Sequence, residues 1–244
     1  MNLKQKIGLI KSLLIYNYKP FNKHRLKKFY SHFINKDDLC FDIGAHTGNR
    51  TGTWLRLGAK VVSVEPQPVF CKLLKRKFGK HPGFILLDKA VSNQIGKAKL
   101  KISSLNPTLS TLSPEWKNVI HEIDDSVKWD DELRVSVTTI DELIKKYGLP
   151  VFCKIDVEGL EDLVLRGNTH TIPMLSFEFF PTTPHQTLNC LDIISSWGRY
   201  EYNWVFVETF KFNSPNWVML DTIKDEIINY KGNYSGDIYA RLIS

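Results

Sequence analysis

The 244-residue sequence has only four cysteines, and no two of them form a C-x-x-C pair. A chain of this length buries roughly 70 to 75% of the surface that it exposes when unfolded, so its core needs neither disulfides nor a metal. The few, widely spaced cysteines therefore predict reduced, packed thiols in a cytosolic protein. The sequence also lacks internal repeats and low-complexity tracts, and its content of 43% apolar and 24% charged residues is typical of an ordinary globular domain.

Residues 1–36 contain no acidic residue but nine basic ones, so this segment alone carries a charge of +9. Removing these nine from the chain's 33 basic residues leaves 24, against 26 acidic residues, in the other 208. The pattern predicts a basic arm on a nearly neutral body. Such an arm is either a solvated surface or a contact for an anionic membrane surface or an acidic acceptor.

No uncharged run in the arm approaches the roughly 18 apolar residues of a membrane crossing, and no small-residue cleavage site follows it. Leu3, Ile7, Ile10 and Leu14 recur at helical spacing, which predicts an amphipathic helix. A second basic helix is expected at residues 23–33. These helices either pack on the main domain or lie on an anionic membrane face, so we expect a cytoplasmic protein, with peripheral membrane attachment as the open alternative.

From residue 37 onward, short apolar runs alternate with helix-length segments, which is typical of an α/β protein with a mostly parallel sheet and helices on both faces. The expected strands are 39–44, 60–65, 84–90, 151–157, 174–180, 200–207, 216–220 and 236–242, and the expected helices are 48–57, 68–78, 140–147, 159–165 and 222–230. The chain then divides into a basic helical arm (1–36) and one domain (37–244). Residues 103–132 lack a clear period and are expected to form a substrate lid or a disordered segment.

The first expected strand runs into a glycine-containing loop, FDIGAHTG. Asp42 is followed by Gly44 and Gly48 around a tight bend, where the missing side chains would let a ligand lie close to the backbone. The second strand ends in SVEPQP and places Glu65 where a carboxylate accepts from the hydroxyls of a ribose. The loop is not the G-x-G-x-x-G of a dinucleotide site. A carboxylate beside it suits the amino group and sulfonium of S-adenosylmethionine better than a pyrophosphate.

The chain resembles the FkbM-type methyltransferases over roughly residues 38–180. The segments that carry the resemblance are FDIGAHTG, SVEPQP, LDKAVSNQIGKAKL, VTTIDEL, KIDVEGLEDLVLRG and LSFEF, with the D-V-E-G-x-E signature at 156–161 as the most specific part. The resemblance implies a Rossmann-like class I methyltransferase fold, with a seven-stranded sheet whose last strand runs antiparallel. It further implies S-adenosylmethionine-dependent O-methylation, most often of sugar hydroxyls in glycans, glycolipids or natural products.

Transferred to this sequence, the family pattern places the methionine end of the cofactor beside Asp42 and its ribose beside Glu65. Asp88, after the third strand, would face the adenine edge, with a turn residue as the alternative. His46 replaces the small or polar residue expected in the loop and is either a substrate contact or simply exposed. The expected cofactor-binding residues are Asp42, Gly44, Ala45, His46, Gly48, Glu65, Pro66, Asp88, Lys89, Ala90 and Asp156.

The end of the fourth strand is where methyl transfer is expected, because ligands of parallel sheets bind at the carboxyl ends of the strands. Alternation along this strand puts Lys154, Asp156 and Glu158 on one side, and Glu178 is a lone acid in the apolar fifth strand. Asp156 is the first candidate for the general base, followed by Glu158, Glu178 and His185. Alternatively, Asp156, Glu158 and Glu178 hold a magnesium ion.

Two other functions are weighed against this one. An RNA 2′-O-methyltransferase would use the same cofactor and a basic arm that follows phosphates, but the seven acidic residues within 103–132 would repel an RNA backbone. A non-catalytic module of a glycan-assembling enzyme is disfavoured because the cofactor residues are all present. A sugar or glycan acceptor is thus the expected partner, with Trp116 and Trp129 as either stacking or packing residues.

Overall fold

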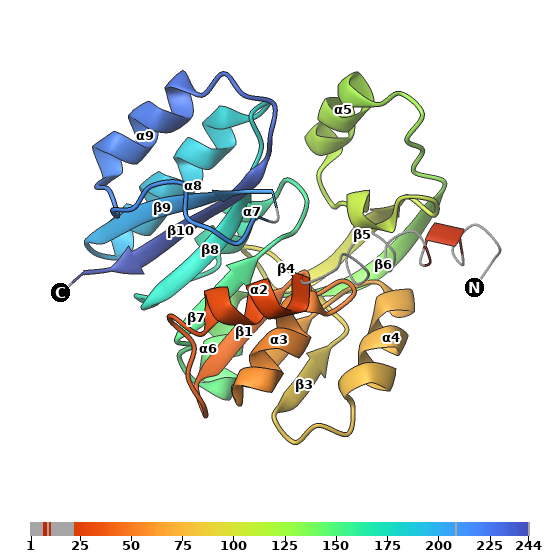
Figure 1. Cartoon of the computed structure of the whole chain (residues 1–244). Coiled ribbons are helices and arrows are strands. Elements are labelled where there is room, and N and C mark those ends of the chain that lie inside the picture. The colour runs from red at the N-terminus through yellow and green to blue at the C-terminus, as the bar shows by residue number, and fades with distance from the viewer. Residues whose placement is uncertain (1–6, 9, 11–21, 208, 244) are drawn as a thin grey trace.

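The larger of two β-sheets has seven strands in the described part of the chain, in the order β3-β2-β1-β7-β8-β10-β9 (Figure 1). The computed structural model describes residues 7, 8, 10, 22–207 and 209–243. The strands are β1 (Leu39–Ile43), β2 (Lys60–Val64), β3 (Phe84–Leu87), β7 (Phe152–Ile155), β8 (Met174–Phe179), β9 (Tyr200–Phe206) and β10 (Gly236–Leu242). They pair in parallel except for β10, which runs antiparallel to both β8 and β9. This topology confirms the expected Rossmann-like sheet.

Helices cover both faces of this sheet because its central strands are apolar on both sides. The helices are α2 (Asn22–Tyr30), α3 (Asn49–Leu57), α4 (Pro68–Phe78), α6 (Ile140–Tyr147), α7 (Glu161–Arg166), α8 (Pro184–Trp197) and α9 (Leu220–Asn229). One hydrophobic core joins the sheet to α6, α7, α8 and α9. A second core joins the sheet to α2 and α3. The site at the strand ends is therefore supported by packed layers on either side.

Helix α2 is part of the second core. Its Phe29 and Tyr30 are buried, and the ring centroid of Tyr30 lies 5.3 Å from that of Trp54 in α3 and 5.7 Å from that of Phe152 in β7. Over the described residues, the boundary expected after residue 36 thus does not separate two packed units. Helix α2 lies where the second basic helix is expected, whereas most of the first amphipathic helix falls outside the described residues.

A second sheet and two further helices lie beside the large sheet, formed by residues for which no strand or helix is expected apart from residue 90. They comprise β4 (Ala90–Val91), β5 (Gly96–Ile102) and β6 (Asp131–Thr138) in the order β4-β6-β5, with the short helix η1 (Pro107–Leu109) and helix α5 (Pro114–Ile123) between β5 and β6. Residues 103–132 are therefore structured around α5. A signal for α5 was present in the sequence, because Trp116, Val119, Ile120 and Ile123 recur at helical spacing after the Ser113-Pro114 start.

Two expected strands differ in the structure. The strand expected at 84–90 is two strands, since β3 ends at Leu87 and Ala90 begins β4 in the second sheet. Residues 216–220 form no strand, and Val218 makes a single bridge to Tyr202.

All four cysteines lie in the described part of the chain and are buried and free, as expected. None of the helices formed by the described residues combines the length and the apolar character that a membrane crossing requires.

Candidate active site

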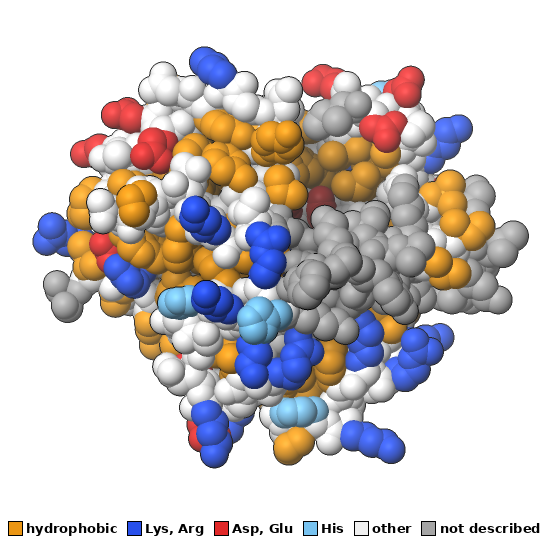
Figure 2. Space-filling view, viewed as in Figure 1, with side chains coloured by type: hydrophobic (Ala, Val, Ile, Leu, Met, Phe, Trp, Pro, Cys, Tyr) orange, Lys and Arg blue, Asp and Glu red, His pale blue; other side chains and the backbone are white. Residues whose placement is uncertain are grey.

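A pocket lies at the carboxyl ends of β1, β2 and β7, the edge at which ligands of parallel sheets bind. Its empty space is about 990 Å³, including the part that is open to solvent. The space-filling view shows the molecule hollowed between the parts that carry α9 and α5 (Figure 2). Most of the expected cofactor residues line the pocket, namely Asp42, Gly44, Ala45, His46, Glu65, Pro66, Lys89, Ala90 and Asp156.

The two glycines of the loop after β1 have positive φ angles, 81° at Gly44 and 79° at Gly48, as a tight bend requires. A Cβ at Gly44 would lie 1.8 Å from the backbone oxygen of Asp156, and a Cβ at Gly48 would lie 2.5 Å from the side chain of Leu74. The atoms that require glycine here are thus protein atoms, contrary to the expectation that a ligand does. Gly44 lines the pocket, whereas Gly48 packs on helix α4 and does not.

Substitution of Gly44 by alanine is expected to destabilise the fold by at least about 2 kcal/mol, since the left-handed backbone alone costs 1–2 kcal/mol and the new Cβ meets the backbone of the β7 loop. Urea denaturation would measure the change in the free energy of unfolding. Gly96→Ala is the matched control, because a Cβ there meets no atom of the described residues within 4 Å, and its effect should stay under about 1 kcal/mol. Equal stability of the two variants would contradict the prediction.

Asp42 fastens the loop to helix α3. Its side chain is buried, and its Oδ2 accepts hydrogen bonds from the backbone N–H of Thr51, at 2.9 Å, and from the Thr51 hydroxyl. Burial raises the pKa of Asp42, while these hydrogen bonds oppose that increase. The carboxylate of Asp42 therefore links the end of β1 to α3 and helps to fix the shape of the pocket beside them.

Glu65 is held by two backbone donors. Its Oε2 accepts from the N–H of His46 and its Oε1 from the N–H of Gln67, each at 2.8 Å, and the side chain is 3% exposed. Burial raises the pKa of Glu65 to about 7, although these hydrogen bonds oppose the shift. Both carboxylate oxygens are thus fixed in direction at the end of β2, where a ribose is expected.

His46 is not simply exposed, as one alternative had it. Its ring lines the pocket and lies 3.9 Å, between centroids, from the ring of Phe70 in α4. Burial lowers the pKa of His46 to about 3, so the imidazole is neutral at physiological pH. That His46 contacts a bound ligand stays a prediction, and the ring that makes this contact would be neutral.

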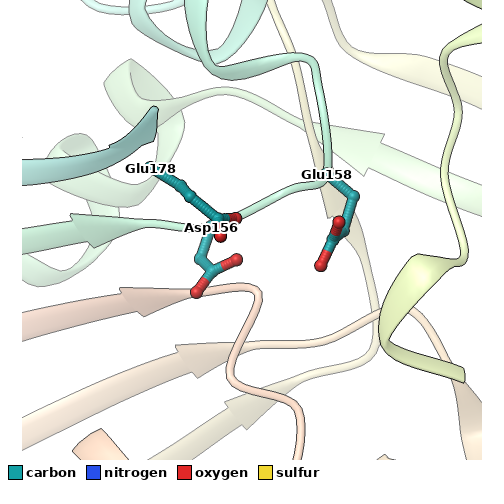
Figure 3. Close-up of side chains that lie close together, drawn as sticks. All are labelled: Asp156, Glu158 and Glu178. Atoms are coloured by element: carbon teal, nitrogen blue, oxygen red, sulfur yellow. The ribbon is translucent and has the colours of Figure 1, made fainter. Parts of the chain in front are cut away.

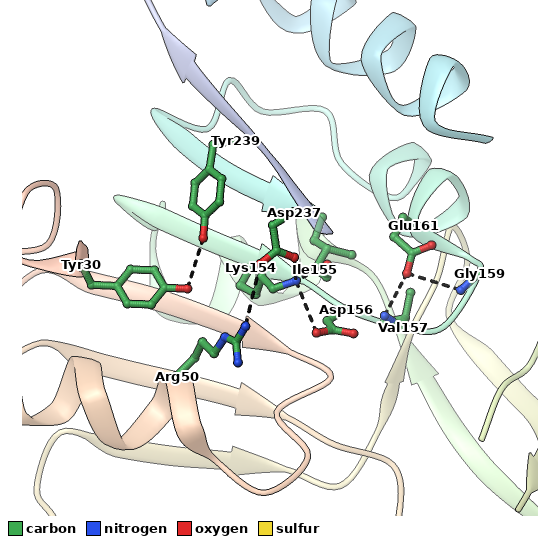
Figure 4. A network of polar contacts seen from close by, with 10 residues as sticks. All are labelled: Tyr30, Arg50, Lys154, Ile155, Asp156, Val157, Gly159, Glu161, Asp237 and Tyr239. Atoms are coloured by element: carbon green, nitrogen blue, oxygen red, sulfur yellow. Dashed lines mark hydrogen bonds and ion pairs between the residues drawn. The ribbon is translucent and has the colours of Figure 1, made fainter. Parts of the chain in front are cut away.

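A buried ion network supports the β7 end of the site (Figure 4). The Nζ of Lys154, which is 1% exposed, lies 3.3 Å from Oδ2 of Asp156 and 2.7 Å from Oδ1 of Asp237 in β10. Arg50 of α3 lies 3.8 Å from the other oxygen of Asp237. Burial alone would lower the pKa of Lys154, but the charges of Asp156 and Asp237 outweigh burial and raise it. The ammonium is therefore a fixed positive charge beside Asp156.

Three carboxyl groups meet next to this network. Each of Asp156, Glu158 and Glu178 offers an oxygen, and these oxygens lie within 4.8 Å of one another (Figure 3). Strand alternation does not bring them together, because β7 ends at Ile155 and both Asp156 and Glu158 follow it in a loop. That part of the prediction is wrong, since Glu158 turns into the left-handed region with φ 57° and leaves the strand path.

The three carboxyl groups differ in charge. Burial would raise the pKa of Asp156, but the positive charges of Lys154 and Arg50 outweigh burial and hold it below its ordinary value. Burial, together with the charge of Asp156, raises the pKa of Glu158 and of Glu178 well above their ordinary values. Asp156 is therefore the member of the cluster that ionises most readily, and the two glutamates hold their protons more tightly.

Besides Gly48 and Glu178, two further expected residues do not line the pocket. Asp88 is exposed directly after β3, in a position that suits its alternative as a turn residue, while its neighbours Lys89 and Ala90 line the pocket. His185 is exposed in the first turn of α8 and does not line the pocket either. Of the expected tryptophans, Trp116 is buried against Phe180, with ring centroids 4.2 Å apart, which is a packing role.

A sequence match to the family described as "Methyltransferase FkbM domain" spans residues 42–225, which is most of the chain. This range contains the loop after β1, the end of β2 and the acidic cluster. The chain belongs to the FkbM methyltransferase family. The FkbM domain is accordingly an S-adenosylmethionine-dependent methyltransferase with a class I fold.

Several solved structures are similar to this FkbM domain at low sequence identity. The precorrin-6y C5,15-methyltransferase of Geobacter metallireducens is 11% identical, with a TM-score of 0.48, and the match covers 93% of this chain and 91% of that one. The O-methyltransferase of Thermotoga maritima is 12% identical (TM-score 0.44; 97% and 71% covered). Aeropyrum pernix fibrillarin with bound S-adenosyl-L-methionine is 10% identical (TM-score 0.44; 85% and 68% covered). No curated protein matches the sequence significantly.

The pocket of the FkbM domain fits the cofactor of its family. The oriented oxygens of Glu65 suit two ribose hydroxyls, and the acidic lining suits a sulfonium and an amino group. Sequence reasoning missed Arg50 and Asp237, which complete the charge balance around Lys154. The available signal for Asp237 is an acid at the start of the apolar strand β10.

The affinity of the FkbM domain for S-adenosylhomocysteine should depend on pH through Glu65. In the expected complex, the ionised Glu65 carboxylate would accept from both ribose hydroxyls, and its pKa of about 7 makes it ionised above that pH and protonated below it. Affinity is therefore expected to be full above pH 8 and to fall up to roughly tenfold per unit below pH 7. Titration calorimetry from pH 5.5 to 8.5 would measure this, and the same slope in Glu65→Gln would contradict it.

Proposed function

We propose that this FkbM domain transfers a methyl group from S-adenosylmethionine to a hydroxyl group of a sugar in a glycan, a glycolipid or a glycosylated product. The observation that carries the proposal is an ionised Asp156, held by Lys154 between the cofactor pocket and the acidic cluster. A hydroxyl is weakly acidic, so its methylation needs a base at the point of transfer. Carboxyl groups beside this base suit a polyhydroxylated acceptor, because they can exchange hydrogen bonds with its hydroxyls.

Each side chain of the site has a distinct role in the proposed reaction. Glu65 binds the ribose and thereby fixes the cofactor along the ends of β1 and β2. Asp156 accepts the proton of the acceptor hydroxyl, while Lys154 holds its carboxylate in place. Glu158 and Glu178, whose oxygens lie within 4.8 Å of those of Asp156, can form hydrogen bonds with further acceptor hydroxyls. The cofactor supplies an electrophilic methyl group when bound, and alignment with the hydroxyl contributes much of the rate.

A magnesium ion is the second candidate for the same acidic cluster. The oxygens of Asp156, Glu158 and Glu178 lie within 4.8 Å of one another, and magnesium prefers such oxygen ligands. The ammonium of Lys154, 3.3 Å from Asp156, already places a positive charge there and would repel the ion. We therefore favour Asp156 as a general base without a metal.

The deciding experiment is methyl transfer from labelled S-adenosylmethionine to a glycan extract of the source organism, with and without EDTA. We expect label in the glycan fraction in both conditions, and loss of label in EDTA would assign the cluster to a metal. Total RNA is the parallel substrate. Label only in RNA, with a steep dependence on salt, would replace the proposal by an RNA methyltransferase. Binding of S-adenosylhomocysteine without transfer to any fraction would indicate a non-catalytic module.

We further propose that residues 1–36 bring the enzyme to an anionic membrane surface or an acidic acceptor. In the described part of this segment, Arg25, Lys27 and Lys28 of α2 are exposed, and Lys and Arg side chains gather over this part of the molecule (Figure 2). Exposed basic side chains attract anionic headgroups, and salt weakens the attraction.

A further inference from the structure

The loop after β7 is held by residues 107–113, from η1 up to the start of α5, which also form one wall of the cofactor pocket. The residues of this wall are Pro107, Thr108, Ser110 and Leu112. Between the last two, Thr111 is fully buried, and its hydroxyl donates a hydrogen bond of 2.7 Å to the backbone oxygen of Glu158. Because successive side chains of an extended segment point in opposite directions, this short segment faces the pocket on one side and the β7 loop on the other.

The β7 loop has a backbone conformation that needs support. Glu158 has a φ of 57° and Gly159 a φ of 91°. A left-handed conformation costs about 1–3 kcal/mol at a residue other than glycine and persists only where the surroundings fix it. Trp116 of α5 provides a second support, because a Cβ on Gly159 would lie 2.8 Å from its indole ring. The ring therefore packs directly on the loop backbone.

Thr111 is itself anchored on several sides. Its backbone exchanges hydrogen bonds of 2.9 and 3.1 Å with Lys101 of β5, and its hydroxyl accepts from the N–H of Ser113 at 2.9 Å. From the opposite side of the loop, Gln186 of α8 donates a hydrogen bond of 2.5 Å to the backbone oxygen of Gly159. The loop is thus clamped between the second sheet and α8.

We propose that Thr111 is a positioning residue for methyl transfer, whose hydroxyl ties the wall of the cofactor pocket to Glu158 and so keeps Asp156 in line with the transferred methyl group. This inference rests on the proposed role of Asp156. A displacement of about 1 Å at a reacting group lowers the rate about 100-fold without a comparable effect on binding. Loss of the Thr111 hydrogen bond should therefore slow the reaction and leave cofactor affinity nearly unchanged.

Thr111→Val removes the hydroxyl and keeps the shape, and Thr111→Ser restores the hydroxyl. We expect Thr111→Val to lower kcat about 10- to 100-fold, with KM for the cofactor and calorimetric affinity for S-adenosylhomocysteine within about threefold of wild type. Thr111→Ser should recover most of the rate. Thr171→Val is the matched control, since the Thr171 hydroxyl also donates to a backbone oxygen, that of Trp197, but at the amino end of β8.

Hydrogen exchange provides a readout that needs no acceptor. Amides of residues 155–162 should exchange faster in Thr111→Val than in wild type, Thr111→Ser or the control. Unchanged exchange, or equal losses of rate and of cofactor affinity, would overturn the inference. If Thr111→Val shows faster hydrogen exchange but the wild-type enzyme methylates no sugar, the role of Thr111 is supported and the proposed sugar substrate is wrong. If Thr111→Val does not fold, Trp116→Phe tests the same clamp, with loosening of residues 155–162 as the expected result.

Discussion

Asp156→Asn is expected to lower the rate of methyl transfer by about 10²- to 10⁴-fold, the range that a general base contributes. The amide has nearly the same shape but cannot accept the proton of a hydroxyl. Since Lys154 retains Asp237 as a partner at 2.7 Å, the surrounding network should remain in place. The measurement is the initial rate at saturating labelled cofactor, together with calorimetric binding of S-adenosylhomocysteine, which should stay within about threefold of wild type.

Asp225→Asn is a matched control, because Asp225 is an exposed acid on α9 that does not line the pocket. It should retain the wild-type rate. A rate for Asp156→Asn close to that of this control would exclude Asp156 as the base and redirect attention to Glu158 and Glu178. A parallel loss of cofactor affinity would assign Asp156 to binding.

Glu65→Ala should weaken binding of S-adenosylhomocysteine by about 1.5 to 3 kcal/mol, or roughly ten- to 150-fold, the scale of lost hydrogen bonds to a charged group. The substitution also removes the acceptor of two backbone N–H groups, those of His46 and Gln67. Calorimetry at pH 8, where Glu65 is ionised, would measure the effect. Wild-type affinity in Glu65→Ala would show that the ribose does not lie at the end of β2.

The positions of Asp42 and Glu65 could be predicted from the sequence because each stands at or just beyond the end of an apolar strand, and parallel strands end at one edge of a sheet. The reason for Gly44 could not be predicted, because it depends on a neighbour more than a hundred residues away, the backbone oxygen of Asp156. The sequence also indicated that Lys154 is buried, because this lysine stands within an apolar strand. The ion pair of Lys154 with Asp237 could not be predicted, because it depends on the pairing of β8 with β10.

The second sheet and α5 were missed for a different physical reason. Strand β5 alternates three lysines with Ala98, Leu100 and Ile102, but only its pairing with β6 shows that it belongs to a separate sheet. Helix α5 repeats its apolar residues at helical spacing, but its packing against Phe180 and the β7 loop depends on the whole fold. These elements flank Thr111 and one wall of the pocket, so the sequence leaves this part of the site undefined although Thr111 contacts Glu158 of the family signature.

The position of β10 in the large sheet affects when the sheet can be completed during synthesis of the chain. The ribosome makes this strand after every other strand of the large sheet, yet it inserts between β8 and β9 and delivers Asp237 to Lys154. Before β10 is made, the chain lacks the nearer of the two carboxylate partners of Lys154 and the strand that pairs with both β8 and β9. The sheet therefore closes, and the centre becomes charge-balanced, only once translation has passed residue 237.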